Sequence, residues 1–178
     1  MTTRNKTISA VLAAVIAATS LGAYAAATTS GTSAKTAAFE QAAVTAEQAV
    51  RAAAQKVPGQ ATEVDFKHKN GQSYYEVEIV SGNQKHEVRV DANNGQVLDS
   101  KVEQDDEKEA TPNAAISIEQ AIAAAQSKTG GKVKEAELEN ENGQAVYKVE
   151  TVSGTQEHDV IINAANGQVI SAQLDQEG

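Results

Sequence analysis

The chain has 178 residues, a formal net charge of −9 at pH 7 and no cysteine. The negative charge argues against nucleic acid as a partner, because phosphates repel carboxylates, and against adsorption on anionic lipid. Without cysteine no disulfide can form, so burial of apolar side chains must hold the fold together.

The amino terminus has the pattern of a secretory signal peptide. Arg4 and Lys6 precede an uncharged run over 8–21, and small-residue sites follow at 23–25 and 25–27. We expect a signal peptide over residues 1–27, with cleavage after residue 25 or 27. An uncleaved anchor is the alternative, but the alanine-rich run falls short of the roughly 20 strongly apolar residues that span a bilayer. The protein is therefore expected in the bacterial cell envelope, periplasmic or secreted, without membrane insertion after cleavage.

The rest of the chain is a tandem repeat. Residues 75–98 return as residues 147–170, at an offset of 72 positions without a gap. We expect a flexible leader over 28–38, repeat 1 over 39–103, an acidic linker over 104–115 and repeat 2 over 116–176. The leader is rich in Thr, Ser, Ala and Gly, and the linker contains an acidic run and a proline. Whether the repeats pack together, exchange strands or hang independently stays open, as does the oligomeric state.

Each repeat begins with a predicted helix. Thr45 and Gln48, and equally Ser117 and Gln120, have the spacing of a capping box. Small apolar residues then recur at helical spacing, which predicts a face that packs closely on a sheet. The helices are expected to end at Pro58-Gly59 and Gly130-Gly131. Residues 39–44 either extend the first helix backward or place Phe39 against the core.

Four strands are predicted after each helix. In repeat 1 they cover about 61–68, 74–80, 85–90 and 96–102, and the first two recur over about 133–140 and 146–152. Asn70-Gly71 and Asn142-Gly143 indicate tight hairpins between the first two strands. The predicted fold class is α+β, with two tandem repeats. In each repeat, one helix packs on one face of a three- to four-stranded antiparallel sheet.

These motifs resemble the PepSY domain family. The helix start Ser/Thr-x-Glu-Gln-Ala-Ile/Val, the strand Tyr-x-Val-Glu and the ending Asp-Ala-x-x-Gly-x-Val/Ile occur in both repeats, at 45–50, 75–78 and 91–98, then 117–122, 147–150 and 163–170. The second copy has Asn163 where the family usually has Asp. The resemblance implies a helix packed on an antiparallel sheet, a non-enzymatic extracytoplasmic module, and kinship with propeptides that restrain secreted metallopeptidases. It brings no catalytic residues.

Two groups of side chains are candidate sites. His86 and His158 are equivalent by the repeat and are the best candidates for metal ligands, but we expect no metal and no cofactor, since companion ligands are missing. Glu76, Glu78, Glu87 and Asp91 are candidates for a partner-binding acidic sheet face. The alternative interpretation is the ordinary wet side of a one-sided sheet.

Nothing in the sequence indicates an enzyme, because cysteine and G-x-S-x-G are both absent. We expect a binding module that engages an extracytoplasmic protein, with a peptidase as one candidate, through an exposed sheet edge or face. The alternative is a small-ligand or metal-cation binding protein of the cell envelope.

Overall fold

The computed structural model describes residues 30–103 and 111–175 of the chain. The expected signal peptide and residues 104–110 of the expected linker lie outside these ranges. None of the helices that the structure describes has the length and apolarity needed to cross a bilayer. The elements, in chain order, are α1 (Ser30–Glu40), α2 (Ala46–Lys56), β1 (Gln60–Lys69), β2 (Gln72–Ser81), β3 (Gln84–Asp91), β4 (Val97–Glu103), α3 (Ile118–Thr129), β5 (Lys132–Glu141), β6 (Gln144–Ser153), β7 (Gln156–Asn163) and β8 (Val169–Leu174).

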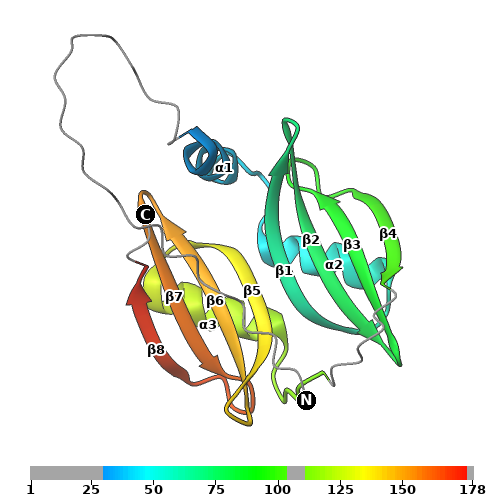
Figure 1. The fold of residues 1–178 in the computed structure, drawn as a ribbon, viewed down its shortest axis with the longest axis vertical. Helices are drawn as coiled ribbons and strands as arrows, with labels where there is room; N and C mark the ends of the chain where they lie inside the picture. The colour runs from blue at the N-terminus through cyan, green and yellow to red at the C-terminus, as the bar shows by residue number, and fades with distance from the viewer. Residues whose placement is uncertain (1–29, 104–110, 176–178) are drawn as a thin grey trace, which may run out of the picture.

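The strands within these ranges form one sheet, so the prediction of a separate sheet for each repeat is wrong. The sheet is antiparallel and eight-stranded, in the order β4-β3-β2-β1-β5-β6-β7-β8 (Figure 1). The first strands of the two repeats pair with each other, with Val64 opposite Ala136 at the centre of a short seam. Alternation along a strand predicts which face is buried, but it carries no information about which strand edge will find a partner. The junction was therefore invisible in the sequence.

Each repeat does contribute one helix and four strands, as predicted, and both helices begin at the predicted capping boxes. The Thr45 hydroxyl accepts the N–H of Gln48 at 3.3 Å, and the Gln48 side chain accepts the N–H of Thr45 at 2.9 Å. Ser117 and Gln120 repeat both hydrogen bonds. These bonds satisfy backbone N–H groups that a helix start would otherwise leave without a partner.

The core lies between the sheet and helices α2 and α3, which cover the same face of the sheet (Figure 1). Their small-residue stripes are buried, which lets the helices approach the strands closely. Val77, Val88, Val149 and Val160 lie beneath them with no exposed surface. Burying one such side chain contributes about 1.5–3 kcal/mol, so this layer supplies the main stabilisation of a fold without disulfides.

The hairpins confirm the predicted turn chemistry. Asn70 and Gly71 have φ values of 53° and 77°, and Asn142 and Gly143 have φ values of 52° and 86°. Positive φ at both central residues matches the right-handed twist of the flanking strands. Each turn thereby sets the register between the first two strands of its repeat.

In each repeat a buried tyrosine of the sheet is hydrogen-bonded to the segment just before α2 or α3. The Tyr75 hydroxyl donates to the carbonyl oxygen of Val44 at 3.1 Å, and the Tyr147 hydroxyl donates to that of Ile116 at 3.0 Å. Burial raises the pKa of both phenols, that of Tyr147 to about 12. Both hydroxyls therefore keep their protons at neutral pH and remain donors.

Helix α1 occupies most of the segment expected to be a flexible leader. Its residue Phe39 is buried, with its ring 5.1 Å from that of Phe66 in an edge-to-face arrangement. The prediction that Phe39 reaches the core is confirmed. The alternative of a longer first helix is wrong, because α1 ends at Glu40 and α2 begins at Ala46. Local composition could not indicate α1, since the stabilising contact is made to a strand distant in sequence.

Candidate functional site

The sheet face opposite α2 and α3, here called the outer face, carries most of the charged residues of the strands. Three of the four predicted surface carboxylates lie on it, namely Glu76, Glu78 and Glu87. The fourth, Asp91, is engaged in the turn after β3, where its Oδ1 accepts the N–H groups of Asn93 at 2.8 Å and Asn94 at 3.2 Å. Asp91 therefore closes the turn, while the other three form part of an acidic surface.

A hollow of about 180 Å³ opens on the outer face of repeat 1. It is lined by the side chains of five glutamates, Glu63, Glu76, Glu78, Glu87 and Glu103. We refer to it as the repeat-1 hollow. Glu63 comes from β1 and Glu103 from the edge strand β4, so the hollow runs from the seam to the edge of the sheet. Sequence reasoning missed both of these end residues.

Three cations form ion pairs with carboxylates of the repeat-1 hollow. Lys85 Nζ lies 2.6 Å from a carboxylate oxygen of Glu78. Arg89 Nε lies 3.2 Å from oxygens of both Glu76 and Glu87. Lys101, on the edge strand, places its Nζ 3.0 Å from Glu87. Most carboxylates of the repeat-1 hollow therefore already have a cationic partner within the chain.

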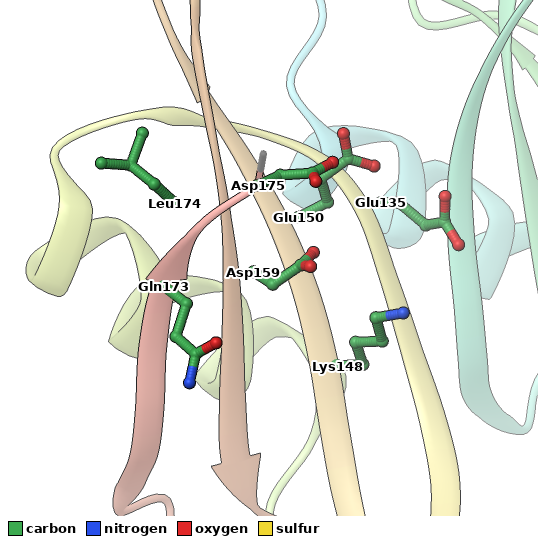
Figure 2. A pocket seen from close by; sticks show the side chains of 7 residues that line it. All are labelled: Glu135, Lys148, Glu150, Asp159, Gln173, Leu174 and Asp175. Atoms are coloured by element: carbon green, nitrogen blue, oxygen red, sulfur yellow. The ribbon is translucent and has the colours of Figure 1, made fainter. Parts of the chain in front are cut away.

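Repeat 2 carries a larger hollow in the equivalent place, with a volume of about 500 Å³ (Figure 2). We refer to it as the repeat-2 hollow. Its lining side chains come from β5, β6, β7 and β8, or directly follow β8, and are Glu135, Lys148, Glu150, Asp159, Gln173, Leu174 and Asp175. Five of them stand 72 positions after the five residues of the repeat-1 hollow. The two hollows are therefore copies of one surface feature.

The cations differ between the two copies. The positions of Lys85, Arg89 and Lys101 are taken in repeat 2 by Glu157, Ile161 and Gln173. Comparing the repeats position by position would have revealed this difference in the sequence.

Lys134 of β5 partly compensates in repeat 2. Its ammonium is hydrogen-bonded to Glu150 and lies 3.1 Å from Glu157. Burial raises the pKa of Glu150 to about 7.

The seam between the repeats is itself acidic. Glu63 lies directly opposite Glu137, and Asp65 directly opposite Glu135. Burial, followed by repulsion from neighbouring carboxylates with Glu137 first, raises the pKa of Glu63 to about 7. The buried Asp65 is paired with Lys67 of its own strand, and its second oxygen lies 3.9 Å from Lys35 of α1.

The structure does not bring the two candidate histidines together. His86 lies on β3 opposite Ile79 and Val102. His158 lies at the equivalent place on β7, and β2, β1, β5 and β6 separate these two strands in the sheet. Over the ranges 30–103 and 111–175, no three His, Asp or Glu side chains gather as a metal-binding group. Metal ligation by either histidine stays an unsupported hypothesis.

Comparison with known proteins identifies the family. The model of the family described as "Peptidase propeptide and YPEB domain" (PepSY) matches twice, over residues 43–101 and 115–173. The uncharacterized protein YkoJ of Bacillus subtilis (strain 168) is 33% identical over 135 residues, which cover 75% of this chain and 76% of YkoJ.

Two solved structures resemble the chain more distantly. A candidate lipoprotein from Clostridium difficile 630 is 21% identical, with a TM-score of 0.45, over 76% of this chain and 95% of that one. The C-terminal domain of YpeB from Bacillus megaterium is 13% identical, with a TM-score of 0.32, over 77% of this chain and 68% of that one. On the two matches to the family model and the relationship to YkoJ, the chain belongs to the PepSY family and carries two copies of its domain in tandem.

Proposed function

We propose that this protein is a non-enzymatic binding module, exported to the periplasm or secreted, that engages another extracytoplasmic protein. A peptidase is the first partner to test, because the family description itself names peptidase propeptides. The observation that carries the proposal is the presence of two such domains in one chain, joined into a single sheet.

The architecture suits a binding platform. Since α2 and α3 both cover one face of the sheet, the two hollows open on the same outer face. A continuous sheet holds them at a defined spacing, so one partner can contact both. The acidic character of this face favours a partner with a basic surface, because complementary charge accelerates and orients association.

The raised pKa values of Glu63 and Glu150 do not require a catalytic role for these residues. Glu63 and Glu150 both have a pKa of about 7, a feature also seen in acid–base catalysts. Burial is the largest cause for both, and neighbouring carboxylates add to it. Burial within the sheet, together with the crowding of like charges, therefore accounts for these pKa shifts, and PepSY domains are in general non-catalytic modules.

Mixing the purified mature protein with peptidases from its own cell envelope tests the proposal. We expect a stable complex on size-exclusion chromatography and slower cleavage of a protein substrate. The absence of both a complex and inhibition, over the full set of envelope proteins captured by a pull-down, would reject it.

Binding of a small ligand or a metal cation is the competing function. The carboxylates of the two hollows are its only basis among the residues described, since the histidines stand apart. Calorimetric titration with Zn²⁺, Cu²⁺ and Ca²⁺ discriminates the cation version. We expect no heat beyond that of dilution, whereas saturable heat would favour the alternative.

A further inference from the structure

The two hollows differ in the cations that accompany their carboxylates. In repeat 1, Lys101 of the edge strand β4 reaches Glu87, and together with Lys85 and Arg89 it forms ion pairs with the acidic lining. In repeat 2 four of the five acids remain, as Glu135, Glu150, Asp159 and Asp175. The fifth is replaced by Lys148, Lys134 pairs with Glu150, and the three cations of repeat 1 are replaced. The position of Lys101 is taken by Gln173, which lies opposite Asp159. The repeat-2 hollow thus keeps Asp159 and Asp175, the two acids nearest the edge of the sheet, and lacks the basic side chain that enters from that edge in repeat 1.

The adjoining edge strand is also unlike its counterpart. β4 presents Asp99 and Lys101 on the outer face, where they bond to Arg89 and Glu87 of β3. The corresponding residues of β8 are Ser171 and Gln173, and no charged residue occurs between Val169 and Leu174. Charges on an edge strand prevent pairing with other chains. β8 lacks this protection.

β8 additionally exposes apolar side chains. Ile170 is 54% exposed and Leu174 is 51% exposed. Within the described ranges β8 is the last strand of the sheet, so one side of its backbone has no strand partner. An uncharged edge with free backbone groups and exposed aliphatic side chains is a surface to which an extended segment can add by main-chain hydrogen bonds.

We propose that an extended segment of a partner protein adds to β8 as a further strand, with apolar residues on one face alternating with Lys or Arg on the other. The apolar side chains would cover Ile170 and Leu174. A basic side chain would reach into the repeat-2 hollow and take the place that Lys101 holds in repeat 1 (Figure 2). This inference rests on the proposed function and adds to it the strand that binds and the chemistry of the bound segment.

The acidic charge of the outer face favours a basic segment at β8 over a second copy of the chain. Pairing β8 with β8 of another molecule would merge two outer faces and place two acidic hollows beside each other. Like charges brought together across strands are destabilising. A segment with basic side chains on that face relieves the same repulsion.

The test uses the full mature protein and a fluorescent synthetic peptide that alternates valine and lysine. We expect saturable binding by fluorescence anisotropy that weakens as salt is raised. The amide signals of residues 169–174 in β8 should shift in heteronuclear NMR spectra, because the added strand hydrogen-bonds there. A matched peptide that alternates valine and glutamate should not bind.

Three variants locate the site. Gln173→Lys restores the cation of repeat 1 within the chain, so affinity for the lysine peptide should fall by about tenfold or more, as expected for one charge-assisted contact. Gln55→Lys adds the same charge at an exposed position of α2, and Lys101→Gln changes β4 instead. Both should leave the amide shifts of β8 intact. Binding that is equal in Gln173→Lys and wild type, or equally weakened by Gln55→Lys, overturns the proposal.

The outcomes separate this inference from the proposed function. An envelope protein that binds wild type and Gln173→Lys with the same affinity would sustain the proposed function and overturn the β8 site. Peptide binding at β8 without any envelope partner would sustain the site and reject the proposed function. A concentration-dependent dimer in sedimentation experiments, lost in Gln173→Lys, would assign β8 to a second copy and overturn the proposal.

Discussion

Glu63 of β1 lies directly opposite Glu137 of β5, at the point where the two repeats join into one sheet. The next outer-face pair of the seam, Asp65 and Glu135, is also acidic. Like charges directly opposite on neighbouring strands are destabilising. The backbone pairing that unites the repeats is therefore opposed by the side chains it brings together, and the junction should respond to pH.

The first prediction concerns this pH response. The pKa of Glu63 is raised from 4.5 to about 7 in the folded protein, by burial first and by Glu137 next. Between these pH values the folded protein holds a proton that the unfolded chain releases, so this group makes the protein less stable as pH rises through the window. Burial raises the pKa of Glu150 as well, but the pKa of its neighbour Glu157 is lowered, which acts in the opposite direction. Urea unfolding as a function of pH measures the effect.

The variant Glu63→Gln isolates the contribution of the seam. At about pH 8 it should be more stable than wild type by roughly 0.5–1 kcal/mol, because the amide removes one of two opposed charges. Near pH 5 the difference should disappear, since Glu63 is then protonated in the folded wild type. A difference that is constant over this range would contradict the assigned protonation of Glu63.

A second prediction concerns the capping boxes. Ser117→Ala removes the hydroxyl that accepts the N–H of Gln120 at the start of α3. Such a change costs about 1 kcal/mol, measurable as a lower urea midpoint. Ser127→Ala is the matched control, because it removes an exposed hydroxyl within the same helix, where alanine is the better helix former. Equal destabilisation by both would show that the cap has no special role.

A third prediction tests the docking of α1. Phe39→Ala removes the buried ring that contacts Phe66. Full loss of a core phenylalanine costs about 3–5 kcal/mol, which is more than a peripheral helix can sustain, so α1 should detach locally. Hydrogen exchange should accelerate in α1 while α2 and α3 stay protected. Phe39→Leu should largely restore protection, and uniform acceleration would contradict local detachment.

A fourth prediction concerns a close backbone approach. A Cβ atom at Gly131 would lie 2.8 Å from the carbonyl oxygen of Val152. Gly131→Ala should therefore force the start of β5 away from β6 and cost roughly 1–3 kcal/mol, as overpacking does. Gly130 ends α3 with φ of 74° but has open space around its Cβ position. Gly130→Ala should therefore cost only about 1 kcal/mol of backbone strain, and thermal melting curves of the two variants compare these costs.

Local patterns were sufficient for α2, α3 and the strands of both repeats, but not for α1. The capping boxes, the Asn-Gly hairpins and the alternation in the strands each involve residues within a few positions of one another. The burial of Val77, Val88, Val149 and Val160 agrees with the same alternation, because one face of each strand must be buried. The candidate site was found only in part. Glu76, Glu78 and Glu87 were recognised as outer-face residues, while Glu63, Glu103 and the whole repeat-2 hollow were not.

The sequence by itself determined the repeat, its helices and strands, and the face that each strand buries, because these depend on short-range spacing and on where apolar side chains fall. Only the tertiary structure decided that β1 and β5 pair, that α1 docks through Phe39, and that corresponding outer-face residues line two hollows with different ion pairs. Those features depend on contacts between residues far apart in the chain. A spacing pattern cannot specify which strand will pair with a free strand edge, or which side chain a buried ring will contact.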